Sequence, residues 1–187
     1  MSMNMKRSLW LVATVMFGLG TAAMADDSAK TTKRKQEIDA QAKTTLDQLV
    51  KDNADAKELY GKAVGYAVFK VTKGGFGISG GFGNGVAVDK ASGKRTYMRM
   101  GLGGVGLGIG GQRYELVVLF ETKERMEKFV AGGWDSSATA EAAAGKEGKA
   151  ARATFYDGVA YYQLTDKGLM AHADITGTKF WVNDELR

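Results

Sequence analysis

The sequence predicts an α+β fold, in which N-terminal amphipathic helices precede a glycine-rich, mainly antiparallel β-sheet or sandwich with one short helix inserted. Three observations predict it. Apolar residues near the N-terminus recur at helical spacing, glycines in the middle alternate with large apolar residues, and short β-type runs joined by turn residues end the chain. The 187 residues, of which 44% are apolar and 25% charged, suit one globular domain.

Composition excludes several kinds of site. The chain has no cysteine, which excludes disulfides, thiolate metal sites and cysteine nucleophiles, and its single histidine, His172, excludes a poly-histidine metal site. We therefore expect no bound metal. There is also no proline among 187 residues, so glycine, asparagine, aspartate and serine must form the turns.

The first 25 residues predict a secretory signal peptide. A basic start ending at Lys6 and Arg7 precedes an apolar stretch from Leu9 to Leu19, and Ala23-Met24-Ala25 forms a cleavage site. The stretch is shorter than the roughly 20 residues that span a bilayer. We expect cleavage after Ala25 and a soluble periplasmic protein, with an uncleaved anchor as the alternative.

Residues 26–53 are expected to form an N-terminal amphipathic helical segment, and residues 54–187 the main domain. The helix is predicted over Lys33–Val50, where the residues at helical spacing are Ile38, Ala42, Leu46, Leu49 and Val50. Asp52 and Asn53 are capping residues for a second helix that runs through Ala63, and Gly65 is expected to end it.

Strands are expected from Tyr66 to Val71 and through the glycine-rich middle, because 17 of the 26 glycines lie between Gly61 and Gly111. Alternation of period two there predicts strands with apolar side chains on one face and bare backbone on the other. A helix, a second sheet or a flat ligand must approach the bare face. Turns at Gly83-Asn84-Gly85 and Ser92-Gly93 divide the region into short antiparallel strands, continued by 96–100 and 115–120.

The remaining elements follow from local signals. Thr122–Val130 predicts a short helix with Thr122 as its N-cap. The propensities of Ser136–Ala153 favour a helix, with a small-residue strand or a surface loop as alternatives. Strands at 159–164 and 169–175 are joined by a turn at 166–168, and Phe180–Val182 is expected to close the sheet. The aromatic residues are mostly expected in the core. They are Tyr60, Tyr66, Phe69, Phe76, Phe82, Tyr97, Phe120, Phe129 and Trp134.

Two catalytic or cofactor motifs occur in the wrong context. Gly101–Gly106 satisfies the G-x-G-x-x-G pattern, but no helix follows it to face a pyrophosphate, so no cofactor is expected. Gly77–Gly81 satisfies G-x-S-x-G around Ser79, with His172 and Asp174 as conceivable partners. The required strand, sharp turn and helix are missing. We expect no enzyme, and a serine hydrolase is the most distant alternative.

Charge is distributed unevenly. Between Lys62 and Arg113 there are eight basic residues and one acidic residue, Asp89. Such a stretch attracts anions, and in an exported protein these are phospholipid head groups, lipopolysaccharide phosphates or acidic glycans, with no nucleic acid expected as a partner. A solvated basic face that serves solubility is the alternative interpretation.

Several segments together resemble the SYLF family of lipid-binding domains. They are Ala56–Phe69 (AKELYGKAVGYAVF), Lys73–Gly77 (KGGFG), Gly80–Val86 (GGFGNGV), Gly103–Tyr114 (GGVGLGIGGQRY), Val118–Phe120, Phe129–Trp134 (FVAGGW) and Asp166–Met170 (DKGLM). They keep the family's order and approximate spacing from about Ala54 to Thr178. The resemblance implies lipid binding without catalysis, partly through an amphipathic N-terminal helix.

The functional prediction is therefore a non-catalytic lipid-binding protein of the cell envelope that contacts anionic phospholipid and takes no cofactor. The basic residues expected to carry the binding are Lys33, Arg34, Lys35, Lys43, Lys70, Lys73, Lys94, Arg95 and Arg99. The alternative is a periplasmic protein-interaction or structural module that holds an envelope protein partner with the glycine-rich sheet face.

Overall fold

The structure is a computed structural model that describes residues 19–132, 134–135, 154–165, 168–171 and 177–187. The chain divides into two compact units, Met1–Gln36 and Glu37–Arg187. The second half of the first helix therefore belongs to the same unit as the sheet.

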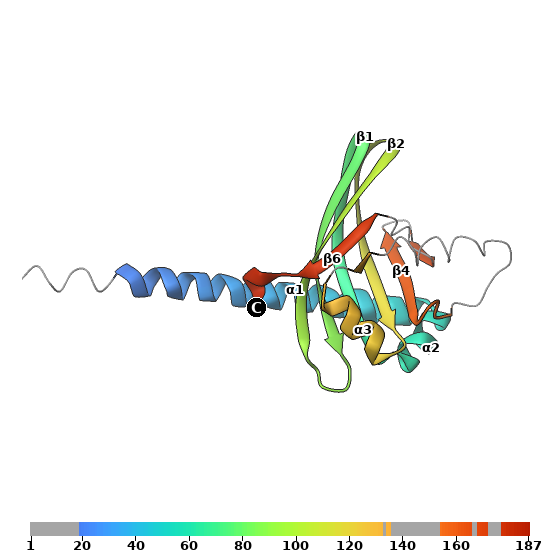
Figure 1. Cartoon of the computed structure of the whole chain (residues 1–187), viewed down its shortest axis with the longest axis horizontal. Helices are drawn as coiled ribbons and strands as arrows, with labels where there is room; N and C mark the ends of the chain where they lie inside the picture. The colour runs from blue at the N-terminus through green and yellow to red at the C-terminus, as the bar shows by residue number, and fades with distance from the viewer. Residues whose placement is uncertain (1–18, 133, 136–153, 166–167, 172–176) are drawn as a thin grey trace, which may run out of the picture. The chain divides into compact units, whose positions relative to one another are not determined.

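The elements confirm the predicted α+β fold class (Figure 1). The helices are α1 (Leu19–Asp52), α2 (Ala54–Lys62) and α3 (Lys123–Val130), and a 3₁₀ turn covers Asp184–Leu186. The strands are β1 (Gly65–Asp89), β2 (Arg95–Phe120), β3 (Trp134–Asp135), β4 (Val159–Thr165), β5 (Gly168–Ala171) and β6 (Thr178–Val182). The helix expected at 136–153, the turn at 166–167 and the end of the strand expected at 169–175 lie outside the described residues.

All six strands form one antiparallel sheet in the order β3-β6-β2-β4-β5, with β1 also paired to β2. Two parts of β2 have different partners. Residues 115–120 pair with β4 and residues 98–102 pair with β6. Strand β2 is therefore the centre of the sheet, and β1 follows it along almost its whole length.

The long β1–β2 hairpin replaces the several short strands that were expected. Its pairing runs from Gly65 opposite Phe120 to Val88 opposite Arg95, with one register shift between Phe76 and Ile78. The turn expected at 83–85 is wrong, because those residues continue to pair with 98–100 of β2. The turn at Ser92-Gly93 is confirmed, with Gly93 at a φ of 68° and the Ser92 amide donating to Asp89.

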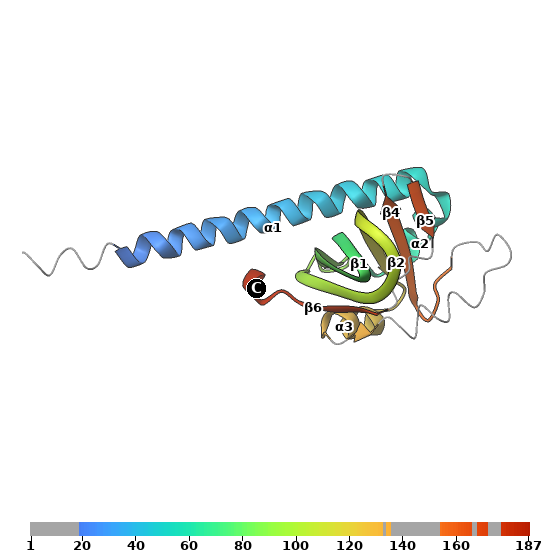
Figure 2. The same cartoon turned by 90° about the horizontal axis from the view of Figure 1, so that it is seen from above.

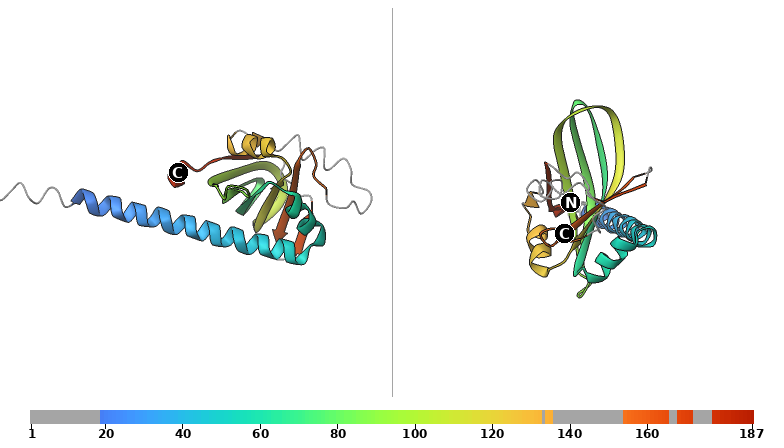
Figure 3. Two further views of the ribbon diagram at one scale, coloured as in Figure 1. Left: turned by 90° about the horizontal axis from the view of Figure 1, so that it is seen from below. Right: turned by 90° about the vertical axis from the view of Figure 1, so that its right-hand side faces the viewer.

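Near the register shift both strands bend over, so that each long strand has a rising and a returning half (Figure 3). The glycines of the returning half of β1 then face its rising half. A methyl group built at Gly81 would lie 2.8 Å from the Thr72 carbonyl oxygen, and one at Gly83 would lie 3.0 Å from the Lys70 carbonyl oxygen. At Gly85 it would overlap the Val68 carbonyl oxygen. The chain's own backbone therefore covers this part of the bare glycine face.

Helix α3 lies on one side of the curved hairpin, and α2 with the second half of α1 lies on the other (Figure 2). An apolar cluster fills each side. One fills the space under α3, where the rings of Phe69, Phe120, Phe129 and Phe180 are fully or almost fully buried and pack edge-on or tilted. The other lies under α2 and the second half of α1, and its strand residues include Val68, Val86, Val117 and Tyr162. The expected burial of Phe69, Phe120 and Phe129 is confirmed.

Helix α1 begins at Leu19 rather than Lys33, and it continues through the alanine-rich residues around the predicted cleavage site. Its predicted apolar face is confirmed, because Ala42, Leu46 and Leu49 are buried in the second cluster. Asn53 caps α2 by accepting a 2.7 Å hydrogen bond from the Ala56 amide, as expected. The helix ends at Lys62 because Ala63 is already extended, so the expected stop at Gly65 is wrong.

Two further expectations are confirmed. Thr122 caps α3 through a hydrogen bond from the Arg125 amide, with 3.3 Å between nitrogen and oxygen. The strand expected at Phe180–Val182 is confirmed as part of β6, but it does not close the sheet, because β3 pairs with its other side.

Candidate functional site

The predicted basic residues of the hairpin lie at its two ends. We call residues 70–84 of β1 and 99–113 of β2 the hairpin arch, because both strands bend over within them (Figure 3). Lys70, Lys73 and Arg99 belong to the arch, whereas Lys94 and Arg95 lie beside the Ser92-Gly93 turn. Gly83 lies against the backbone of Lys70. From Gly83, strand β1 continues for six residues to Asp89 at the turn, a length of about 20 Å. The structure therefore does not bring all five together.

At the turn end Arg95 has a carboxylate partner, whereas Lys94 has none within 4 Å among the described residues. The Arg95 guanidinium lies 3.5 Å from the Asp39 carboxylate of α1, and Asp39 also accepts a 3.0 Å hydrogen bond from the Tyr97 hydroxyl. Burial, followed by this hydrogen bond, raises the pKa of Tyr97 to about 12. The Asp39 contacts fix the helix on the sheet, so Arg95 has a structural role here.

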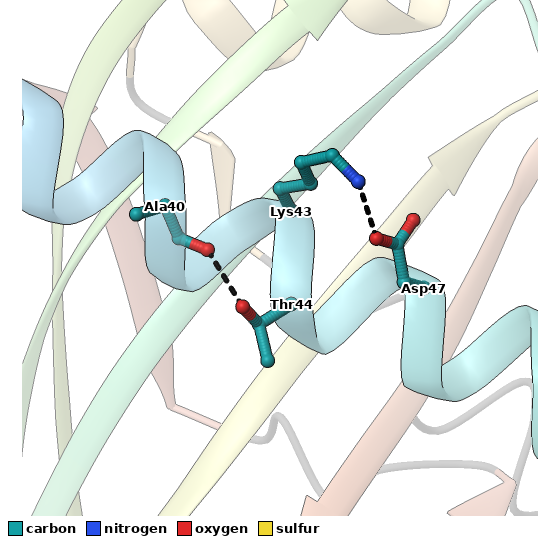
Figure 4. Close-up of polar contacts among 4 residues, drawn as sticks. All are labelled: Ala40, Lys43, Thr44 and Asp47. Atoms are coloured by element: carbon teal, nitrogen blue, oxygen red, sulfur yellow. Dashed lines mark hydrogen bonds and ion pairs between the residues drawn. The ribbon is translucent and has the colours of Figure 1, made fainter.

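On α1, the predicted residue Lys43 forms an i,i+4 pair with Asp47 at 2.5 Å, and the hydrogen bond and charge of Asp47 raise the pKa of Lys43 (Figure 4). The neighbouring Thr44 hydroxyl donates to the Ala40 carbonyl at 3.0 Å (Figure 4). Lys33 and Arg34 are exposed and Lys35 is half-buried, all within the unit that ends at Gln36. The apolar face of α1 between Ala42 and Leu49 packs on the sheet, so it is occupied in this structure.

The arch differs from the turn end because it contains cations and no acidic residue in either strand segment. Lys70 is exposed, and its paired residue on β2 is Glu115. The Glu115 carboxylate accepts a 3.4 Å hydrogen bond from the Gln41 side chain and forms no ion pair with Lys70. Lys73 is half-buried and has no carboxylate within 4 Å among the described residues. Because side chains alternate along a strand, Lys70 and Lys73 lie on opposite faces.

Two cations of this region were not among the predicted residues. Arg113 is exposed and pairs with Thr72, and Lys179 of β6 is exposed and pairs with Gly101. Arg113 belonged to the basic stretch recognised in the sequence. Lys179 is far away in the chain, and only the pairing of β6 with β2 brings it to the arch.

Exposed aromatic side chains lie beside these cations. Phe82 is 67% exposed and Trp181 is 42% exposed, so the expectation that Phe82 is a core residue is wrong. Phe82 pairs with Gly101, and a methyl group built at Gly101 would lie 3.1 Å from the Trp181 ring. The Trp181 ring therefore lies over the bare backbone of Gly101, next to the position of Phe82.

The remaining motifs have no catalytic context in the described residues. Ser79 lies within β1 and pairs with Gly104, so the strand continues where a nucleophile elbow requires a turn and a helix. Gly101–Gly106 lies within β2. His172 and Asp174 are outside the described residues, as are the side chains of Phe76 and Trp134. Across the described ranges, no three acidic or histidine side chains gather to hold a metal ion.

Comparison with known proteins agrees with the geometry. Residues 101–186 match the Ysc84 family, described as Las17-binding protein actin regulators. The chain belongs to this family, which is also called SYLF. SYLF domains are generally non-catalytic.

A curated relative of this SYLF chain is the beta cell expansion factor A of Aeromonas veronii. The two are 41% identical over 149 residues, which cover 80% of this chain and 57% of the relative. The chain thus spans a little over half the length of that relative. In the described part of this SYLF chain, none of the helices combines the length and the apolar character needed to cross a membrane.

Proposed function

We propose that this SYLF protein is a non-catalytic, peripheral lipid-binding protein of the cell envelope that contacts anionic phospholipid head groups with its hairpin arch. The observation that carries the proposal is the acid-free arch. It extends beyond α3 and β4 (Figure 1) and bears Lys70, Lys73 and Arg113 without an acidic residue in either strand segment. Arg99 also belongs to the arch, but it is paired with Glu185 at 2.6 Å. Each basic residue near an anionic membrane surface contributes about 1 kcal/mol to binding.

Ion pairs of other predicted cations support this choice of residues. Lys43, Arg95 and Arg99 already have carboxylate partners. Lys70, Lys73 and Arg113 have none within 4 Å among the described residues. The helix residues Lys33, Arg34 and Lys35 add a second basic segment, which we propose as an auxiliary contact. Because the apolar face of α1 from Ala42 to Leu49 packs on the sheet, this contact is electrostatic.

The proposal includes export to the periplasm, with cleavage after Ala25, since the leader pattern is that of a signal peptide. The test therefore uses the exported protein, with its N-terminus read by mass spectrometry. It is sedimented with vesicles of phosphatidylcholine alone or with phosphatidylglycerol, at low and high salt. We expect binding to the anionic vesicles that weakens with salt.

Charge reversal then locates the surface. The variant Lys70→Glu, Lys73→Glu, Arg113→Glu should bind anionic vesicles about 100-fold more weakly at low salt, from about 1 kcal/mol per residue. The matched control is Lys51→Glu, Lys57→Glu, Lys128→Glu, which makes the same change in net charge at exposed helical lysines. Equal loss in both variants would contradict a role for the arch. The variant Lys33→Glu, Arg34→Glu, Lys35→Glu tests the auxiliary contact.

A protein-interaction module is the second candidate, and the description of the family as Las17-binding actin regulators favours it. The glycine face was its expected binding surface. At Gly81, Gly83 and Gly85 that face is already covered by the rising half of β1. Absence of binding to every vesicle would favour this second candidate.

A further inference from the structure

The outer face of the returning hairpin carries a small grid of side chains at the lower edge of the arch. In one row, Phe82 of β1, Gly101 of β2 and Lys179 of β6 are successive partners in the pairing. In the next row, Asn84, Arg99 and Trp181 are successive partners. Because directly paired residues share a face of a sheet, both rows face the same way.

The aromatic residues of this grid are exposed although the protein has a large apolar core. Phe82 and Trp181 are the two large apolar side chains exposed among the described residues, at 67% and 42%. The next pair toward the turn on this face is Val86 and Tyr97, and α1 covers it. Both residues belong to or pack against the second apolar cluster, and the Tyr97 hydroxyl donates to Asp39 of α1. Neighbouring exposed aromatic residues on one face indicate a binding surface.

The C-terminal segment holds Trp181 in place. The Asn183 amide donates to the Tyr97 carbonyl at 2.9 Å and so continues the pairing of β6, and Leu186 is buried. Gly101 has no side chain, and this leaves the space that the Trp181 ring occupies. A ring held by the backbone in this way is pre-organised for contact.

The charges around the aromatic pair fit an anionic surface. Lys179 is exposed, with Asp135 of β3 as its directly paired residue, and it forms no ion pair with the carboxylates whose side chains the structure describes. A second acidic residue of this surface, Glu185, is paired with the Arg99 guanidinium at 2.6 Å. Trp and Phe partition into the interface of a bilayer, where Trp keeps a polar N–H near the head groups, and Lys extends its ammonium toward them.

We propose that Phe82 and Trp181 form an aromatic anchor that inserts into the interfacial region of an anionic phospholipid bilayer, with Lys179 at the head groups. This inference rests on the proposed lipid binding and adds to it. The arch supplies an electrostatic attraction that salt weakens, whereas the anchor supplies an apolar contribution that persists at high salt.

The test compares Phe82→Ser, Trp181→Ser with the conservative Phe82→Leu, Trp181→Phe in the exported protein. Circular dichroism melting first establishes that each variant is folded. On vesicles of phosphatidylcholine and phosphatidylglycerol at high salt, we expect the serine variant to bind at least about tenfold more weakly. The free energy of burying one large apolar side chain corresponds to at least that change in affinity. The conservative variant should keep most of the binding.

Fluorescence quenching by brominated phospholipid gives the second readout. Quenching in the wild type should exceed that in Trp181→Phe at equal bound fraction, because Trp181 would reach the acyl boundary. Wild-type binding that high salt abolishes, with equal quenching in the two proteins, would overturn the anchor and leave the electrostatic function standing. Failure of the wild type to bind any vesicle would overturn both and favour a protein partner on this face.

Discussion

A side chain at Gly85 should strongly destabilise the protein, because this glycine is where the returning half of β1 lies closest to the rising half. A methyl group there would overlap the Val68 carbonyl oxygen and lie 2.6 and 2.8 Å from two ring atoms of Phe69. The Phe69 ring has no room to move, since it is fully buried against the rings of Phe129 and Phe180.

The expected cost of Gly85→Ala is about 3 kcal/mol, the upper end for overpacking, since backbone as well as side chain must shift. At about 2–4 °C per kcal/mol for a chain of this size, the melting temperature should fall by about 6–12 °C. Urea unfolding followed by circular dichroism measures the free energy of unfolding directly.

The matched control is Gly103→Ala in β2, where an added methyl group meets nothing within 4 Å. That variant should be neutral or slightly more stable, because alanine loses less backbone entropy than glycine on folding. If Gly85→Ala and Gly103→Ala unfold within about 0.5 kcal/mol of each other, the proposed role of the glycine face as backbone-packing surface is wrong.

Two further predictions concern the contact of α1 with β2 and the N-terminal cap of α2. Because the pKa of Tyr97 rises from 10.0 to about 12 in the folded protein, its contribution to stability is present below pH 10 and is lost as the pH rises toward 12. Tyr97→Phe should therefore lessen the fall of the urea midpoint between pH 10 and 12, and an unchanged pH profile would refute this. Asn53→Ala should lower the free energy of unfolding by about 1 kcal/mol, because α2 loses its N-terminal cap. The control Asp52→Ala, at an exposed position, should change it by less than about 0.5 kcal/mol. Equal effects in urea unfolding would refute the capping role of Asn53.

Local signals in the sequence were sufficient for the N-terminal caps of α2 and α3, but not for the start of α1 or the end of α2. Asn53 and Thr122 cap because their side chains reach amides three residues away, and this depends on nothing distant in the chain. The apolar period of α1 likewise indicated which face is buried. The alternation of glycine and apolar residues indicated strands for the same reason, since side-chain direction in a strand depends on parity alone.

The length and bending of the strands could not be predicted locally. Gly83-Asn84-Gly85 has the composition of a turn, yet these residues stay in β1 because they pair with β2. The rising half of β1 packs against the backbone of Gly83 and Gly85 so closely that a side chain there would not fit. The glycines therefore serve close packing rather than chain reversal. Only the folded hairpin distinguishes the two uses.

The candidate site divides in the same way. Its basic residues from Lys70 to Arg113 were visible as a charge bias in the sequence, and the SYLF resemblance came from the same stretch. Which cations are compensated, and which lie together, depends on partners such as Asp39, Asp47 and Glu185 that are distant in the chain or set by helical spacing. The amino-acid composition gives the number of charged residues but not which of them form ion pairs.

The sequence by itself determined the class of fold, the N-terminal caps of α2 and α3, the parity of the strands and the basic character of the middle of the chain, because each of these depends on neighbours a few residues apart. Only the tertiary structure decided that Phe82 is exposed and that Trp181 and Lys179 lie beside it. These residues are about 100 positions apart in the sequence and meet only through the pairing of β6 with β2 and of β2 with β1.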